Sequence, residues 1–130
     1  MANFGAYKII EAGLDSGLAS CTSSGDEFEN SGIEFIRIAN THATQAYNVT
    51  IVAQSTSLKH SGYGTLSKAN VVKQVNAGQS IYLGPFKQRA FNDSNERVQI
   101  TYLTTGGAAI STISSGSHGL KIEVLYLEQN

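Results

Sequence analysis

Short runs of alternating apolar and polar residues are the feature that most constrains the fold of this chain. In the run Tyr47–Ala53, apolar residues alternate with Asn48 and Thr50, and Val98–Leu103 alternates in the same way. A period of two places successive side chains on opposite faces of a β-strand. These runs therefore predict strands that bury one face in a core and leave the other face toward solvent.

Further candidates bring the expected total to seven or eight short strands separated by polar turns. The clearer ones are Ile33–Ala39, Val71–Val75, Ser80–Leu83 and Leu120–Val124, and the weaker ones are Ala6–Glu11 and Ala109–Ile113. Asn76-Ala77-Gly78 is a turn signal between two of these runs. We expect this turn, with Gly78, to join Val71–Val75 to Ser80–Leu83 as a hairpin.

No segment shows the apolar stripe of an amphipathic helix. The best candidate, Ile9–Leu18, contains Gly13 and Gly17, and an interior glycine costs about 1 kcal/mol relative to alanine. Strands without alternating helices predict an antiparallel sandwich or small barrel rather than βαβ units. Of these we favour an all-β fold: a single antiparallel β-sandwich of jelly-roll or Greek-key-like order over residues 1–130, with residues 1–26 as an N-terminal arm.

The single proline marks the end of one strand. Gly84 and Pro85 follow Ser80–Leu83 directly. Because proline has no N–H to give to a β-ladder, this strand must end, bulge or lie at a sheet edge here. We expect Phe86 to turn inward and plug the end of the sandwich.

Two polar tracts interrupt the strands. Ser55–Ala69 holds Gly62 and Gly64 around Tyr63 and predicts an extended surface loop. Thr104–Gly119 is rich in Gly, Ser and Thr. It predicts a flexible hairpin or a loop that orders against a partner.

Composition excludes several classes of function. Charged residues make up 15% of the chain, below the ~25% of a typical globular protein. The net charge is −1 and no basic patch stands out, so nucleic-acid binding through phosphate neutralisation is disfavoured. No apolar run approaches the ~20 residues of a membrane span, and none suits a signal peptide. The one cysteine, Cys21, cannot form an intrachain disulfide, which permits a reducing cytoplasm.

Chemistry-bearing residues form no recognisable catalytic or metal-binding pattern. His42, His60 and His118 lie far apart in expected loops, without the spacing of a zinc site. No trio of nucleophile, base and carboxylate can be named. The acidic run Asp26–Glu29 does not match a calcium-binding loop, and we interpret it as a solvated turn. We therefore expect neither an enzyme nor a metal or other cofactor.

Two stretches carry a resemblance to a known family. From Glu27 to Asn40 a turn with Asn30-Ser31-Gly32 leads into a strand that ends in Ala39-Asn40. From Val75 to Phe86 the chain has Val-Asn-Ala-Gly and then Gly-Pro-Phe, followed by Phe91-Asn92. These patterns resemble those of head decoration, or cement, proteins of tailed bacteriophages, which are small β-sandwiches. The resemblance covers roughly residues 27–127 and departs from the family in the two polar tracts.

The resemblance implies a structural role. A decoration protein of this kind is made in the host cytoplasm, binds the major capsid protein on the outer surface of the virion, and stabilises contacts between coat subunits. It implies a homo-oligomer, a dimer or trimer, that binds no nucleic acid and no membrane. The candidates for contact with the capsid or with other subunits are Phe4, Tyr7, Ile9, Ile10 and Tyr63. The structural turn and plug are Gly78, Gly84, Pro85 and Phe86.

Two other functions stay open at this point. A carbohydrate- or receptor-binding virion module would expose an aromatic or Asp/Asn cluster at one end of the sandwich, and Asn92–Asn95 is the stretch that could supply one. A neck, tail or head–tail joining component would instead occur as a ring of fixed copy number.

Overall fold

The computed structural model describes residues 2–9, 13–14, 17–54, 58–60, 64–66, 69–113 and 118–127. Within these residues the chain is almost entirely β-structure, with one short helix and one 3₁₀ turn. The elements are β1 (Ala2–Phe4), β2 (Ala6–Ile9), β3 (Ala19–Ser20), β4 (Asp26–Glu29), β5 (Phe35–Asn40), β6 (Tyr47–Ile51), β7 (Leu58–His60), β8 (Gly64–Leu66), β9 (Val71–Val75), β10 (Ser80–Leu83), α1 (Gln88–Phe91), β11 (Arg97–Thr104), η1 (Ile110–Thr112) and β12 (Leu120–Leu127).

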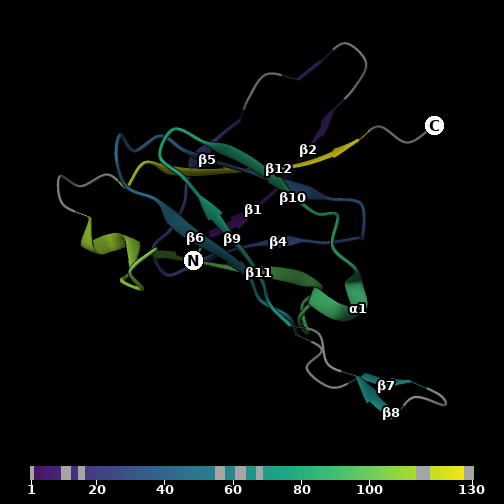
Figure 1. Ribbon diagram of the computed structural model, residues 1–130. Helices are drawn as coiled ribbons and strands as arrows, with labels where there is room; N and C mark the ends of the chain where they lie inside the picture. The colour runs from purple at the N-terminus through teal and green to yellow at the C-terminus, as the bar shows by residue number, and fades with distance from the viewer. Residues whose placement is uncertain are drawn as a thin grey trace.

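Two five-stranded sheets pack face to face among the described residues (Figure 1). Sheet A has the order β1-β4-β11-β6-β9, and sheet B has the order β10-β5-β12-β2, with β3 beside β2 on the same side of β12. The expected β-sandwich is confirmed. The jelly-roll order and the total of seven or eight strands are wrong, and both sheets are mixed rather than antiparallel because β1 and β2 run parallel to their neighbours.

The first strands of the chain cause this departure. Residues 2–9, which we expected within an arm, supply an edge strand to each sheet, and β2 falls in the weaker strand candidate Ala6–Glu11. β1 lies parallel to β4 in sheet A, the chain passes Gly5, and β2 then lies parallel to β12 in sheet B. We call residues 2–9 the N-terminal clip. Strands this short carry too few residues for a period-two pattern, so the sequence could not reveal their pairing.

The turn after β9 joins the two sheets and is not a hairpin turn. β9 pairs with β6 in sheet A, whereas β10 pairs with β5 in sheet B. Asn40 holds the crossing: its Nδ2 donates to the Val75 carbonyl (3.2 Å) and to the Gln45 carbonyl (2.7 Å). Its backbone N–H donates to the Gln79 carbonyl, and its carbonyl accepts from the Gly78 N–H. Gly78 has a φ of +74°, which glycine adopts readily. The predicted hairpin is therefore wrong.

Three further local predictions need correction. The acidic run at Asp26–Glu29 is strand β4 and not a solvated turn. The Ser55–Ala69 tract includes the two-stranded sheet β7-β8, which projects from the sandwich in Figure 1, and His60 ends β7. Ala109–Ile113 forms the turn η1 with one isolated bridge to Leu103 instead of a strand.

The core lies between the sheets and is built by the alternating side chains. β6 buries Tyr47, Val49 and Ile51, as the period-two pattern predicts. β11 buries its alternate residues in the same way. Val98 and Ile100 of β11 are fully buried. The other strands supply further fully buried side chains, which are Phe28, Ile36, Ile38, Val75, Leu120 and Ile122.

An aromatic cluster closes one end of the core. Phe86 is buried beside Phe28 and Phe91, with ring centroids 6.0 Å and 5.5 Å away. β10 ends just before Gly84 and lies at an edge of sheet B. Pro85 therefore interrupts no ladder. Gly84 has a φ of +112°, and a Cβ there would lie 3.0 Å from the Phe86 ring.

A buried carboxylate joins the N-terminal clip to sheet A. Asp26 faces the core and is fully buried. Its Oδ2 accepts hydrogen bonds from the Tyr102 hydroxyl (2.7 Å) and the Thr22 N–H (3.0 Å), and its Oδ1 accepts one from the Ala2 N–H (3.2 Å). A carboxylate in an apolar core is costly unless such donors satisfy it. The three donors therefore connect β1, the turn after β3 and β11 at one point.

Removing one of these donors tests the role of Asp26. We expect Tyr102→Phe to lower the free energy of unfolding by about 1.5–3 kcal/mol, the usual range for a hydrogen bond to a charged group. Urea unfolding followed by circular dichroism measures this loss. Tyr82→Phe is the matched control because Tyr82 is largely exposed. Equal losses in the two variants would contradict the role assigned to Asp26.

Cys21 provides a second test of the core. The pKa of the Cys21 thiol is raised to about 12, chiefly by burial. A hydrogen bond with Tyr102 acts to lower the pKa, and the Asp26 charge acts to raise it. Only the thiolate is nucleophilic. We expect iodoacetamide at pH 8 to leave Cys21 unmodified in the folded protein and to alkylate it fully in urea, as mass spectrometry would measure. Labelling of the folded protein at the rate of a free thiol would show that the site is open.

Candidate functional site

The two outer faces of the sandwich differ in chemistry. Outward side chains of sheet A are mostly polar, as expected for a sheet face that meets water. They are Asn3, Glu27, Glu29, Asn48, Thr50, Gln74, Arg97, Gln99 and Thr101, with Val72 and Leu103 as apolar exceptions. Outward side chains of sheet B are mainly apolar. This asymmetry makes sheet B the candidate functional surface.

We define the sheet-B face by three of the four rows of outward residues on this sheet, together with Leu14. The remaining row, which is Ser80, Ala39, Lys121 and Ser20, is more polar and lies beside the face. The register places the residues of the face in three adjoining rows, so they form one continuous surface. The first row is Tyr82, Arg37 and Glu123, the second is Phe35, Leu125 and Tyr7, the third is Leu127 and Ile9, and Leu14 lies beside them.

An ion pair forms the polar centre of the sheet-B face. Arg37 Nη1 lies 3.3 Å from Glu123 Oε1, and the Gly17 N–H donates to Glu123 Oε2 at 2.8 Å. Glu123 is only 4% exposed, and a buried carboxylate is costly unless it is paired as it is here. Since the two charges cancel, the centre of the face offers no net charge to a partner. The Gly17 bond also holds the segment before β3 against one side of the face.

Several large apolar side chains around this pair remain open to solvent. Tyr82 is 64% exposed, Leu127 56%, Tyr7 49% and Leu14 42%. An aromatic side chain offers 150–250 Å², so the two tyrosines alone leave on the order of 200 Å² uncovered. Monomeric proteins rarely expose apolar patches larger than a few hundred Å². Because these side chains gather on one face, the sheet-B face has the composition of a contact surface.

The sheet-B face is hollowed rather than flat. An open cavity of about 210 Å³ is lined by Ile9, Leu14, Arg37, Tyr82, Glu123 and Leu125. The Phe35 ring lies beside that of Tyr82, with centroids 6.4 Å apart and the planes tilted by 50°. Apolar walls around a neutralised ion pair suit a protein side chain from a partner more than a charged ligand.

The structure brings together only part of the predicted contact set. Tyr7 and Ile9 lie on the sheet-B face. Phe4 lies on β1 and packs against the core. Ile10 and Tyr63 lie outside the described residues.

Sequence reasoning missed the other residues of the face. Phe35 and Tyr82 fall within predicted strands, but no pattern marked them, Leu125 or Leu127 as contact residues. A usable signal was present, because β12 carries the apolar run Val124–Leu127 without alternation. Such runs indicate a strand whose two faces are both covered.

The turn and plug residues are not members of the sheet-B face, although Gly84 lies against Phe35. Gly78 occupies the turn between the sheets, and Gly84, Pro85 and Phe86 lie after β10 at the end closed by the aromatic cluster. Phe86 is buried, whereas Gly78, Gly84 and Pro85 are exposed.

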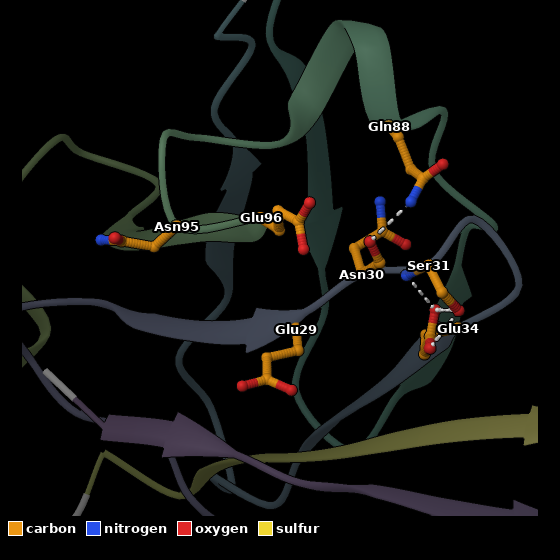
Figure 2. A pocket seen from close by; sticks show the side chains of 7 residues that line it. All are labelled: Glu29, Asn30, Ser31, Glu34, Gln88, Asn95 and Glu96. Carbon is orange, nitrogen blue, oxygen red and sulfur yellow. Dashed lines mark hydrogen bonds between the residues drawn. The ribbon is translucent and has the colours of Figure 1, made fainter.

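An acidic pocket lies at the end of the sandwich near α1 (Figure 2). Glu29, Glu34 and Glu96 line this cavity of about 290 Å³. The three carboxylates do not converge on one point (Figure 2), and Glu34 accepts hydrogen bonds from the N–H and hydroxyl of Ser31 at 2.8 and 2.7 Å. No group of three metal-ligating side chains occurs in the part of the chain that the structure describes.

The Asn92–Asn95 stretch uses its polar groups internally. Asp93 Oδ1 accepts from the backbone N–H groups of Asn95 and Arg97, and Oδ2 accepts from the Gln99 side chain at 2.6 Å. Asn92 Oδ1 accepts from the Asn30 side-chain amide, and Asn92 Nδ2 donates to the Asn30 backbone carbonyl. The side chains of Asn92 and Asp93 are therefore committed to internal hydrogen bonds.

The environment of Asp93 changes its acidity. Burial acts to raise the pKa of the Asp93 carboxyl, but hydrogen bonds from Arg97, Gln99 and Asn95 and the Arg97 charge together lower the pKa below its ordinary value of 3.8. A carboxyl whose pKa is lower in the folded state stabilises the fold above its unfolded pKa. That contribution is lost as the pH falls through the folded pKa.

The lowered pKa of Asp93 predicts that the stability of its turn depends on pH. We expect Asp93→Asn to melt at a lower temperature than the wild type at pH 7, and the difference to shrink as the pH falls below 3.8. Thermal melting over a pH series measures this. A difference that stays constant down to the acid transition would show that the Asp93 charge has no part in the turn.

No helix in the described ranges is long and apolar enough to cross a membrane. No protein-family model, curated protein or solved structure matches this chain.

Proposed function

We propose that this chain is a capsid decoration protein that docks through its sheet-B face on the outside of a phage head and stabilises contacts between coat subunits. The observation that carries the proposal is the apolar outer face of sheet B on a sandwich whose other outer face is polar. The sequence patterns at Glu27–Asn40 and Val75–Phe86 supply the link to capsids. The face supplies a means of attachment.

Attachment through this face depends on apolar burial. Fully burying one large apolar side chain contributes about 1.5–3 kcal/mol, and the face offers several that are half exposed. Because Arg37 and Glu123 neutralise one another, binding depends on shape and only weakly on salt. A coat shell repeats the same seam many times, so a modest affinity per copy is sufficient to cover the shell and stabilise it.

The N-terminal clip gives the face a fixed shape before docking. Tyr7 and Ile9 belong to β2, which is paired along β12. The position that a Cβ on Gly17 would occupy lies 3.1 Å from the Tyr7 ring, so the ring is packed on the segment that Glu123 holds. A preorganised contact surface loses less conformational entropy on binding.

Co-sedimentation with coat shells assembled without this protein tests the proposal. We expect saturable binding at a fixed ratio to coat subunits over the whole shell, together with a higher temperature of shell disruption. Absence of binding would contradict the proposal. Binding confined to a single vertex would point to a neck or tail component instead.

A pair of matched variants tests the surface itself. Leu127→Glu puts a charge on the sheet-B face, and we expect it to weaken shell binding at least about tenfold, which corresponds to ~1.4 kcal/mol. Leu103→Glu is the control because Leu103 is a similarly exposed leucine, at 44% against 56%, on the outer face of sheet A. Equal weakening by both variants, with both folded by circular dichroism, would show that the sheet-B face is not the docking surface.

A further inference from the structure

Strand β10 leaves one side of its backbone open at the edge of sheet B. β5 pairs with the other side in unbroken register from Ser80↔Ala39 to Leu83↔Ile36. Among the described residues no strand lies beyond β10. An open edge of this kind is a template for pairing with another strand.

The direction of the open backbone groups follows from one hydrogen bond. The Asn40 N–H donates to the Gln79 carbonyl. Because residues alternate between bonded and non-bonded pairs in an antiparallel ladder, Ile81 and Leu83 direct their backbone groups to β5. Ser80 and Tyr82 therefore direct their N–H and C=O groups away from β5, toward the open side.

The other edges of the two sheets carry features that discourage strand addition. On β9, Lys73 lies opposite the buried Val49 and so faces inward at the edge of sheet A. An inward charge is a known protection of edge strands. β1 offers only three residues, and β2 and β3 divide the remaining edge into two short pieces. β10 has no charged residue, so it is the edge best suited to pairing.

We propose that β10 pairs with β10 of a second copy of this chain, antiparallel about a two-fold axis through Tyr82. In this register Tyr82 faces Tyr82 of the second copy, and Ile81 faces Leu83. Residues directly opposite one another lie on the same face of a sheet. The two inward apolar residues therefore meet each other, and the two tyrosines form an aromatic pair on the outer face.

Three further features fit this pairing. The N–H and C=O of Tyr82 both point to the open side, so each can form a hydrogen bond with Tyr82 of the second copy. The ladder ends at the Ile81–Leu83 pairs because Gly84 has a φ of +112°. Pro85 lies outside the paired residues, so its missing N–H costs no bond. Arg37 beside Tyr82 is already neutralised by Glu123, so the two copies do not repel.

The two-fold axis stands perpendicular to the sheet, so both sheet-B faces point to the same side. Pairing then extends the two faces into one continuous apolar surface. If that surface docks on a capsid, which rests on the proposed function, each dimer binds through two linked sites and gains avidity. The contact is small, so we expect a dissociation constant on the order of micromolar rather than nanomolar.

Sedimentation velocity over a concentration series tests the pairing. We expect the wild type and Tyr82→Phe to reach a monomer–dimer equilibrium and Tyr82→Lys, which puts like charges directly opposite each other, to dissociate at least about tenfold more readily. Val72→Lys is the matched control, because Val72 is an exposed apolar residue, at 59% against 64%, on the edge strand of the other sheet. It should dimerise like the wild type.

A cross-link provides a readout that does not depend on loss of binding. Cα atoms of a bonded antiparallel pair lie about 5.5 Å apart, within the 4.4–6.8 Å span of a disulfide. We expect Tyr82→Cys to form covalent dimers under mild oxidation and Val72→Cys to stay monomeric on a non-reducing gel. Cys21 is buried in both variants.

Two results would overturn the pairing: a wild type that stays monomeric to about millimolar concentration, or undiminished dimerisation by Tyr82→Lys. The shell-binding assay separates this inference from the proposed function. A monomeric wild type that still binds shells overturns the dimer alone. A dimer that pairs through β10 but ignores shells supports the pairing and overturns the capsid role.

Discussion

The burial of the Asp26 carboxylate between the two sheets is the constraint on which the rest of the structure depends. Its donors come from β1, from the turn after β3 and from β11, so one side chain connects the N-terminal clip to sheet A. The clip then continues through Gly5 into β2 and brings Tyr7 to the outer face of sheet B. The buried Asp26 thus helps to position Tyr7 on the outer face of sheet B.

Sheet B differs from an ordinary solvent-facing sheet in being apolar on both sides. Ile122 and Val124 of β12 pack into the core, while Leu125 and Leu127 lie on the other face. A buried ion pair keeps the middle of that face neutral. The same sheet also ends in the uncharged edge strand β10. The sheet-B face and the open edge of β10 meet at Tyr82. Docking through the face and pairing through the edge are therefore compatible.

Sequence patterns located the strands that alternate between core and water. β9 and β10 have the predicted bounds, and β6 and β11 were placed within two residues, because one face of these strands is buried and the pattern is local. β4 was missed because its inward positions hold Asp26 as well as Phe28, which disguises the alternation. The link between β9 and β10 was wrongly predicted as a hairpin. A glycine turn has the same sequence signals whether the strands on either side pair with each other or join different sheets.

The sequence by itself determined that this chain folds as strands, because side-chain alternation is set by neighbouring residues. It also contained Tyr7 and Ile9 of the candidate face. Only the tertiary structure decided which apolar residues stay exposed. In a run such as Val124–Leu127 both faces are apolar, and the choice between inside and outside is made by pairing with β5 and β2, which are distant in sequence. Long-range register, which no local pattern encodes, therefore created the surface.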